Sequence, residues 1–472
     1  MHDAPLTFAP DPSGAVPTGS TLLRAAMADA CATFPDVFGD LDLGPPARFK
    51  RTLADRIVRF EARRAASPRR VEVARGLAAY VPDRTLLRGE PLAAAMSRAA
   101  AAPEPVGAAR PGAGAAGWTP TVDHGGRRWV GPEFATLADA LLADHELTEP
   151  AARALRWAAR DRIDLTGERF VLLGAGAELA PTRYLLEAGA RVVGIDPRPP
   201  SVGPTAGEWV PVCADLLADP AAACAAVAAE AAHGPVHLGL YAYAPGGGRE
   251  LLLTTVMNAI AAALPPDRVR SVSMWVSPTT PGEALPEDQR GRQLRRDAAP
   301  RWQRALARAR VLREPAHHLE GDVAIARSIV PLQGPTYLAA QYLGKMTPAE
   351  VWAVDRHPAR VSANVAGITA TRSLSHPLFE AGFLAAPTFG IRVFTPELTR
   401  VLATLLMVHD LFAPSAPSAD PTGGPAAQAR RVGAQSVHGG VRSIPFELDP
   451  TIRVAAALGL SRKPSLLLRL RG

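Results

Sequence analysis

The most constraining feature of the chain is an unbroken alternation of strand and helix patterns that begins near residue 168 and continues to about residue 371. It opens with ERFVLLGAGAELAPTRYLLEAGARVVGIDP, in which a strand at 170–173 precedes a glycine turn, a helix at about 179–188 and a second strand at 191–195. This spacing suits a right-handed crossover between parallel strands. The alternation therefore predicts an α/β fold with a doubly wound parallel sheet.

Four further strand patterns continue the alternation. Helical patterns at 220–232 and 251–263 separate the first three, and an arginine-rich helical pattern at 287–313 and a long helix at 336–354 come before the last. The strands are expected in the segments WVPVCAD, VHLGLYAYAP, VRSVSMWVSP and RVSANVAG, and the segment PELTRVLATLLMVHDLF at 396–412 is expected to be a helix. With the first two, the sequence predicts six parallel strands.

The remaining segments differ from this domain in composition and periodicity. Stretches rich in Pro, Gly and Ser indicate loops or linkers, and apolar residues at helical spacing indicate helices. We expect the following parts: a flexible tail at 1–20, a helical N-terminal region at 21–160 with a Pro/Gly-rich linker near 102–120, a Rossmann-like domain at 161–412 with an insertion at 280–335, and a flexible loop with a C-terminal extension at 413–472.

The composition fits a globular protein that acts on a small molecule. The chain has 472 residues, 47% of them hydrophobic and 21% charged, with a formal net charge of +7. Basic proteins can bind nucleic-acid phosphates, but the arginines here are scattered through alanine-rich segments and form no known nucleic-acid-binding spacing. We therefore expect an anionic small-molecule substrate rather than nucleic acid. A homo-oligomer is compatible with this composition.

The cysteines and the apolar segments point to a cytoplasmic protein. Cys31, Cys213 and Cys224 share no metal-ligand spacing and do not form an even disulfide set. The N-terminal segment lacks a basic stretch followed by an apolar core, and no apolar run approaches the roughly 18 to 20 residues of a membrane span. The sequence thus predicts no metal and no membrane contact.

Two glycines mark a candidate nucleotide site. Gly174 and Gly176 follow the first strand, where the backbone of a dinucleotide-binding domain turns tightly and approaches a pyrophosphate. The next residues, Ala177 and Glu178, lead into a helix whose free N–H groups and positive dipole end favour phosphates. Because the third glycine of the usual fingerprint is missing, an ordinary strand-to-helix turn is the competing interpretation.

An acidic residue about twenty positions later supports the nucleotide interpretation. A carboxylate at Asp196 can accept hydrogen bonds from both ribose hydroxyls of NAD and would repel the 2′-phosphate of NADP. Arg198 could reverse that preference, and Asp196 could instead be a turn residue before Pro197. We expect NAD or NADP as the cofactor and favour NAD.

The order of these landmarks resembles the short-chain dehydrogenase/reductase (SDR) superfamily over residues 168–371. The resemblance implies a Rossmann domain in which Asp215, after the third strand, holds the adenine amino group. The Asn-Ala-Gly motif of the family falls on residues 243–245, where Ala244 is retained. In the loop NVAGITAT, the resemblance implies contacts of Thr369 and Thr371 with the nicotinamide carboxamide or a phosphate.

The same resemblance supplies catalytic candidates. Ser277 at the end of the fifth strand, or Ser273 within it, takes the place of the catalytic serine, which polarises a carbonyl group. Lys345 matches the lysine of the family, which binds the ribose and lowers the pKa of a catalytic tyrosine. The position four residues before it, where the family has that tyrosine, is occupied by Gln341.

Two tyrosines near Gln341 are candidates for the acid catalyst. Tyr337, Gln341 and Lys345 are spaced four apart and share one helix face, whereas Tyr342 points about 100° away. Either tyrosine could supply the proton from a shifted position, Gln341 could merely orient the substrate, or the domain could have left redox chemistry. Plain helix packing also explains both tyrosines.

Two other segments were considered as substrate contacts. The insertion carries nine arginines between residues 290 and 313, one or two of which could clamp a carboxylate or the phosphates of a carrier. A solvated helix face is the more ordinary interpretation. The segment VHGGVR at 437–442 could contact a substrate, although a packed turn explains it equally simply.

Together these features predict an atypical oxidoreductase of SDR type. It would transfer a hydride between a nicotinamide cofactor and a small, anionic or carrier-bound metabolite, in specialised biosynthesis. The alternatives are a non-redox enzyme on the same fold, such as a dehydratase, cyclase or isomerase, and a non-catalytic nucleotide-binding protein. Fold alone does not decide between them.

Overall fold

A six-stranded parallel sheet forms the centre of the computed structural model, which describes residues 5–469 except 12, 245, 247, 357, 358, 375 and 421. The order is β13-β10-β9-β6-β7-β8, and every neighbouring pair is parallel. All six predicted strands form, and their order along the sheet is that of a doubly wound Rossmann-type domain. The strands are β6 (Arg169–Leu173), β7 (Arg191–Asp196), β8 (Glu208–Cys213), β9 (Val236–Leu240), β10 (Val269–Val276) and β13 (Arg360–Val365).

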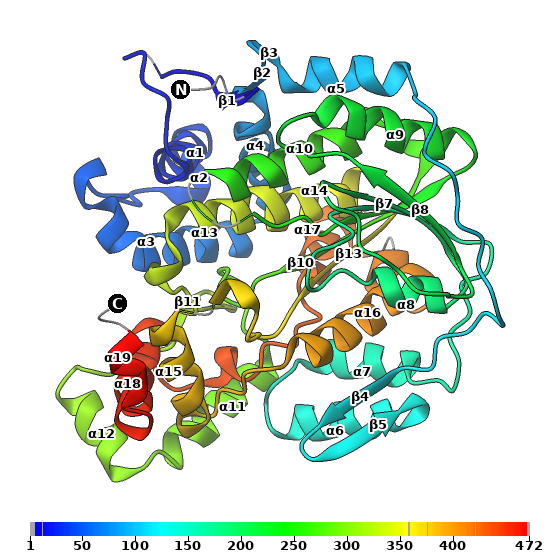
Figure 1. The fold of residues 1–472 in the computed structure, drawn as a ribbon. Coiled ribbons are helices and arrows are strands. Elements are labelled where there is room, and N and C mark those ends of the chain that lie inside the picture. Colours follow the sequence, from blue (N-terminus) through cyan, green and yellow to red (C-terminus); the bar gives the residue numbers. More distant parts are fainter. Residues whose placement is uncertain are drawn as a thin grey trace.

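Helices cover both faces of the sheet, as Figure 1 shows. In β6, Phe170 and Leu172 face one layer, while Val171 and Leu173 face the other. Such strands are apolar on both sides, as parallel sheets require. One layer holds α5 (Leu92–Ala101), α9 (Pro220–Ala232), α10 (Arg249–Ala263) and α14 (Thr347–Asp355); the other holds α6 (Phe134–Ala143), α7 (Glu149–Ala158), α8 (Thr182–Glu187) and α16 (Pro396–Phe412).

Two of these helices begin and end at the predicted residues. Asp219 caps α9 by accepting a hydrogen bond from the Ala222 N–H at 3.2 Å, and Thr395 caps α16 by accepting one from the Leu398 N–H at 3.2 Å. A proline follows each cap at the first helical position, where its missing N–H costs nothing. These local signals fix both helix starts.

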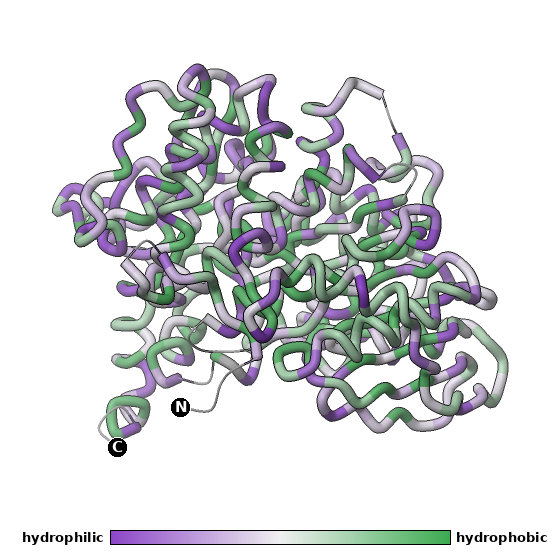
Figure 2. Tube along the Cα trace, turned by 90° about the horizontal axis from the view of Figure 1, so that it is seen from above, coloured by the Kyte–Doolittle hydropathy of each residue, from purple (hydrophilic) through white to green (hydrophobic). Residues whose placement is uncertain are grey.

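The predicted N-terminal helical region divides between two places. Its first helices, together with α13 (Pro335–Gln341) and part of α10, enclose a separate apolar core. Its last helices, α5 to α7, instead join the two layers on the sheet. Figure 2 shows hydrophobic stretches gathered in the interior, with hydrophilic ones mostly at the periphery. The first helices are α1 (Gly19–Thr33), α2 (Pro35–Phe38), α3 (Pro46–Ala66) and α4 (Arg70–Tyr80).

Extended segments pair with both edges of the sheet. In the predicted linker, Arg110 exchanges two main-chain hydrogen bonds with Trp209 of β8, at 2.8 and 3.0 Å. At the opposite edge, the Val365 N–H of β13 donates to the Gln435 carbonyl at 3.2 Å, and the Val437 N–H donates to the Val365 carbonyl at 2.9 Å. These contacts satisfy backbone groups that an open edge would leave exposed.

Two segments expected to be flexible contain regular structure. Within the predicted tail, β1 (Leu6–Phe8) pairs with β2 (Thr85–Leu87) and buries two apolar side chains. Within the predicted loop, α17 (Gly424–Arg431) forms, and residues 435–438 are buried. The C-terminal extension likewise folds into α18 (Leu448–Arg462), which packs on α15 (Pro377–Ala385). The alanine- and glycine-rich composition of these segments gives no sign of this structure, because the contacts that stabilise it involve residues distant in the sequence.

The long helix predicted at 336–354 is interrupted by a π-helical turn at Tyr342–Met346, between α13 and α14. Pro348 has no N–H to bond the Gly344 carbonyl four residues earlier. The Asn258 side chain of α10 donates to that carbonyl instead, at 2.8 Å. The Thr347 hydroxyl bonds the Tyr342 carbonyl at 3.1 Å, so side-chain hydrogen bonds hold the interruption.

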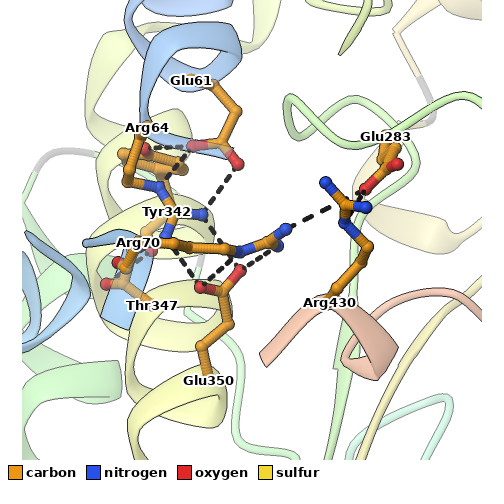
Figure 3. A network of polar contacts seen from close by, with 8 residues as sticks. All are labelled: Glu61, Arg64, Arg70, Glu283, Tyr342, Thr347, Glu350 and Arg430. Atoms are coloured by element: carbon orange, nitrogen blue, oxygen red, sulfur yellow. Dashed lines mark hydrogen bonds and ion pairs between the residues drawn. The ribbon is translucent and has the colours of Figure 1, made fainter. Parts of the chain in front are cut away.

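A buried ion network joins this helix to α3 and α4, as Figure 3 shows. Arg64 donates to Glu350 at 2.7 and 3.0 Å and to Glu61 at 2.7 and 2.8 Å. Arg70 donates to the same Glu350 at 2.6 and 3.2 Å. The Tyr342 hydroxyl completes the network by donating to Glu61 at 2.5 Å.

The charges in this network depend on one another. Burial alone would raise the pKa of Glu350, but Arg64 and Arg70 outweigh it and lower that pKa to about 2. The unfolded value is about 4.3. A depressed carboxyl pKa contributes stability above the unfolded value, and this contribution is lost as the pH falls from about 4.5 towards 2.

We predict that Glu350→Gln destabilises the protein by ~3–5 kcal/mol near neutral pH, because it leaves two arginines without a buried counterion. Chemical denaturation at pH 7 and at pH 3 measures the effect. The difference from the wild type should shrink at pH 3, where Glu350 begins to protonate. Glu104→Gln, at an exposed residue, is the control. An equal loss of stability at both pH values would contradict this account.

Candidate functional site

The predicted catalytic residues Ser277, Tyr337 and Gln341 lie together at the carboxyl end of β10. The Ser277 N–H donates to the Gln341 side-chain oxygen at 3.0 Å, and the Tyr337 phenol lies near the Ser277 side chain, which partly offsets the rise that burial causes in the pKa of Tyr337. Tyr337 and Gln341 are one turn apart on α13, so both reach the same strand end. The structure therefore assembles a serine hydroxyl, a phenol and an amide in one cluster.

Two polar residues that sequence reasoning missed extend this cluster. The Ser277 hydroxyl lies 2.8 Å from the Thr279 hydroxyl. Thr279 in turn donates to the Gln333 side-chain oxygen at 2.7 Å. Neither residue belongs to a recognisable sequence motif. They come into contact only because the loop after β10 folds beside α13.

Lys345 lies on the π-helical turn, next to the same strand end. Its ammonium group donates to the Trp275 carbonyl of β10 at 3.2 Å and lies 4.0 Å from a Glu250 carboxylate oxygen. The other Glu250 oxygen accepts the Ala244 N–H at 2.9 Å, just after β9. Burial lowers the pKa of Lys345 and raises that of Glu250, and each group partly offsets the effect on the other.

Two alternative candidates lie elsewhere. Tyr342 points into the N-terminal helices, where its hydroxyl donates to Glu61 at 2.5 Å. Ser273 lies within the sheet, with its hydroxyl 2.7 Å from that of Tyr241. Of the two candidate tyrosines and the two candidate serines, only Tyr337 and Ser277 therefore lie near each other among the described residues.

The glycine turn after β6 lies beside the loop that follows β9. Gly174 has a φ of +88°, and a Cβ on it would lie 2.3 Å from the Ala242 Cα, so glycine is required there. The Gly176 N–H donates to one Asp196 oxygen at 3.1 Å, and the Arg198 N–H donates to the other at 3.0 Å. The predicted ribose-binding carboxylate thus lies against the predicted phosphate-binding turn.

The helix after this turn starts later than predicted. It was expected from about residue 179, but α8 begins at Thr182 and has six residues. The cause is Pro181, because a residue before proline disfavours helical backbone. Residues 177–180 form turns instead, and the Glu178 and Leu179 carbonyls accept hydrogen bonds from Arg400 and Trp275 at 2.8 and 2.9 Å. A long helix dipole therefore does not point at the turn.

The other predicted cofactor contacts have local roles. Asp215 accepts the Leu217 N–H at 2.8 Å in a turn, and the Ala244 N–H is used by Glu250. The buried Thr369 hydroxyl lies 2.7 Å from that of Thr399 on α16. The Thr371 N–H donates to the Thr369 carbonyl at 2.8 Å. Pro245, the last residue of the altered family motif, lies outside the described residues.

The loop that contains both threonines reaches the glycine turn. The N–H of Arg372, directly after it, donates to a Glu178 carboxylate oxygen at 3.1 Å. The loop follows β13 and the turn follows β6, so two carboxyl ends of the sheet converge here. This is the edge at which ligands bind in open α/β sheets.

The histidine segment VHGGVR is packed. His438 is buried with its Nε2 2.8 Å from an Asp288 oxygen, and its Nδ1 accepts the Gly440 N–H at 3.0 Å. From the arginine-rich insertion, Arg295 donates to the Gly440 carbonyl at 3.1 Å. The helical pattern predicted at 287–313 is divided into two helices, α11 (Pro286–Asp297) and α12 (Arg301–Arg308). Of these, α11 packs on the VHGGVR segment.

Neither family models nor curated proteins gave a match to this chain. Cys31, Cys213 and Cys224 are all free. In the part of the chain that the structure describes, no three His, Cys, Asp or Glu side chains are grouped as metal ligands would be. No helix among the described residues is long and apolar enough to cross a membrane.

We predict that Lys345→Met lowers the melting temperature more at pH 8 than at pH 5. Without the ammonium group, the pKa of the buried Glu250 rises further above its unfolded value, so ionisation at higher pH opposes folding. Thermal unfolding across this pH range measures the effect. The double variant with Glu250→Gln should lose the added pH dependence. If the double variant keeps it, another group titrates.

Proposed function

We propose that the protein is an NAD(P)-dependent oxidoreductase of SDR type that acts on a carbonyl group of a small molecule. The observation that carries this proposal is that Ser277 lies beside Tyr337 and is held by Gln341 at the carboxyl end of β10. Lys345 and Glu250 lie at the same edge of the sheet. Together they supply a proton donor, a carbonyl polariser and a cation beside the candidate nucleotide turn.

The residues at the turn fit part of a dinucleotide. Asp196 would hold the ribose hydroxyls, the backbone of Gly174 and Gly176 would lie beside the pyrophosphate, and Lys345 would contact the second ribose. The shortness of α8 makes the phosphate contacts weaker than in a domain with a full helix. The bound nicotinamide would supply or accept the hydride.

The acid form of Tyr337 favours reduction. Burial raises the pKa of this phenol, and the nearby Ser277 side chain offsets the rise only in part. A neutral phenol donates a proton to a carbonyl oxygen as hydride reaches the carbon. The Ser277 hydroxyl would hydrogen-bond the same oxygen as its negative charge develops. The Gln341 amide, which accepts the Ser277 N–H, holds the serine in place.

A second candidate is a non-redox enzyme that uses the same proton donor. The short α8 helix favours it, because a six-residue helix that starts late offers a weak dipole to a pyrophosphate. In that case Ser277 and Tyr337 would stabilise an enolate in an isomerase or dehydratase reaction without hydride transfer.

We predict that the protein quenches or shifts NADH fluorescence on binding and prefers NADH to NADPH. Asp196→Ala should shift the ratio of the two affinities towards NADPH by about tenfold, because it removes a charge that repels the 2′-phosphate. Asp123→Ala, at an exposed residue of the β4 strand (Thr121–His124), is the control. Absence of binding of either nucleotide at millimolar concentration would refute the cofactor proposal.

We predict that Tyr337→Phe lowers kcat about 10²- to 10⁴-fold with a carbonyl substrate, and that Ser277→Ala lowers it by a similar factor. Absorbance of the reduced nicotinamide measures turnover across a panel of small ketones, aldehydes and keto acids. Tyr184→Phe, which removes a hydroxyl from a ring stacked on Trp118, should leave kcat unchanged. Turnover without any absorbance change, lost in Tyr337→Phe, would favour the non-redox candidate.

A further inference from the structure

A polar cavity lies between the ends of β10 and β13, α14 and the segment before residue 435. It measures about 30 Å³, above the roughly 10–15 Å³ that one water needs. Segments from opposite ends of the chain form its wall, including α4, the loop after β10 and the η9 turn (Val441–Ser443). It can take a group of a few atoms, and it is too small for a nucleotide.

Among the residues that the structure describes, four polar atoms in this wall are buried and find no hydrogen-bond partner. They are Arg70 Nη1, Thr280 Oγ1, Arg442 Nε and Glu283 Oε2. Arg70, Thr280 and Arg442 are 5%, 2% and 4% exposed. A buried donor left unsatisfied costs about 1–3 kcal/mol. Three such donors around one space indicate that the space is shaped for a polar occupant.

The neighbouring groups do not satisfy these atoms. Arg70 Nη1 lies 3.9 Å from Glu283 Oε2, too far for a hydrogen bond, although the other two nitrogens of Arg70 bind Glu350. Arg442 Nη1 donates to the Glu283 main-chain carbonyl at 3.1 Å, which leaves Nε free. Burial lowers the pKa of Arg442, as expected for a cation with incomplete compensation.

One side of the cavity opens to solvent. The side chains of Glu283 and Arg430 are 21% and 51% exposed, and Arg430 Nε lies 3.5 Å from Glu283 Oε2. Figure 3 shows this pair across from Arg70. Arg430 and Glu283 therefore form the mouth, and Arg70, Thr280 and Arg442 form the floor.

Charge identifies the class of occupant. Glu61 and Glu350 are already engaged by Arg64 and Arg70. The cavity is lined by three guanidinium groups, those of Arg70, Arg430 and Arg442, and by the carboxylates of Glu61, Glu283 and Glu350. With Arg64, which pairs with Glu61 and Glu350, four guanidinium groups face three carboxylates, an excess of one positive charge. Donors outnumber acceptors at the floor, so an acceptor with negative charge fits there.

We propose that this cavity binds the carboxylate group of a small organic acid. The carboxylate would accept hydrogen bonds from Arg70 Nη1, Arg442 Nε and the Thr280 hydroxyl. A planar carboxylate with two oxygens suits guanidinium donors on one floor, whereas a phosphate, with its larger negative charge, would meet stronger repulsion from Glu283. This inference goes beyond the proposed function and does not depend on nucleotide binding.

The test is calorimetric titration of the full chain with acetate, lactate and succinate at constant ionic strength, and with acetamide and succinamide as uncharged probes. We expect at least one acid to bind with a dissociation constant below about 1 mM and the amides not to bind. Thr280→Val keeps the shape of the side chain but removes a donor, and should weaken binding about fivefold. Glu283→Gln removes a repelling charge and should strengthen it.

Two further variants separate this site from others. In Gly282→Ala, the added Cβ would lie 2.6 Å from Arg442 Nη2, so it must displace that guanidinium group and should weaken binding. Thr404→Val removes a buried hydroxyl that bonds the Arg400 carbonyl on α16 and should leave affinity unchanged. Binding by no acid, or binding that Thr280→Val, Gly282→Ala and Glu283→Gln all leave unchanged, would overturn the proposal. NADH titration of the same variants tests the proposed function separately.

Discussion

The buried pairing of Arg64 and Arg70 with Glu350 is the interaction on which the arrangement of the molecule depends. It links α3 and α4 to α14 across about 280 positions in sequence. Each ion alone would be expensive to bury, so the helices must meet in the register that pairs them. Directly before α14, the π-helical turn carries Lys345 and α13 carries Tyr337 and Gln341. A contact that docks the N-terminal helices therefore also fixes the position of the candidate catalytic residues.

The π-helical turn lets one continuous helical segment contribute to the candidate catalytic cluster and to the buried ion network. Before the turn, Tyr337 and Gln341 face the end of β10. Within it, Tyr342 faces Glu61 and Lys345 faces the Trp275 carbonyl. The adjacent side chains of Tyr342 and Gln341 thus belong to the ion network and to the candidate catalytic cluster, respectively. The proline that causes the interruption is visible in the sequence, but the asparagine that stabilises it lies ninety positions earlier.

What could be predicted from the sequence depended on how local its physical cause is. The six strands and the limits of α9 and α16 follow from apolar runs, caps and prolines within a few residues. The pairing of Arg110 with Trp209 and of Gln435 with Val365 depends on backbone groups far apart, and no composition signal marks it. At the site, Ser277 and Gln341 were found by order along the chain. Glu250 could not be singled out from the sequence, because acidic residues are common in the first turn of a helix.

The chain uses its cations for different purposes. Arginine cannot readily lose its proton, and its planar fork can bind two carboxylates at once. Arginine accordingly supplies the cations of the buried network and of the polar cavity. Of the three lysines, Lys50 and Lys463 are exposed, whereas Lys345 is buried near the end of β10, where it donates to the Trp275 carbonyl. A buried ammonium has a pKa that its surroundings can move, and Glu250 adjusts it here. The cation whose pKa the surroundings can move therefore lies at the candidate catalytic site, and the arginines lie in the buried network and around the proposed carboxylate site.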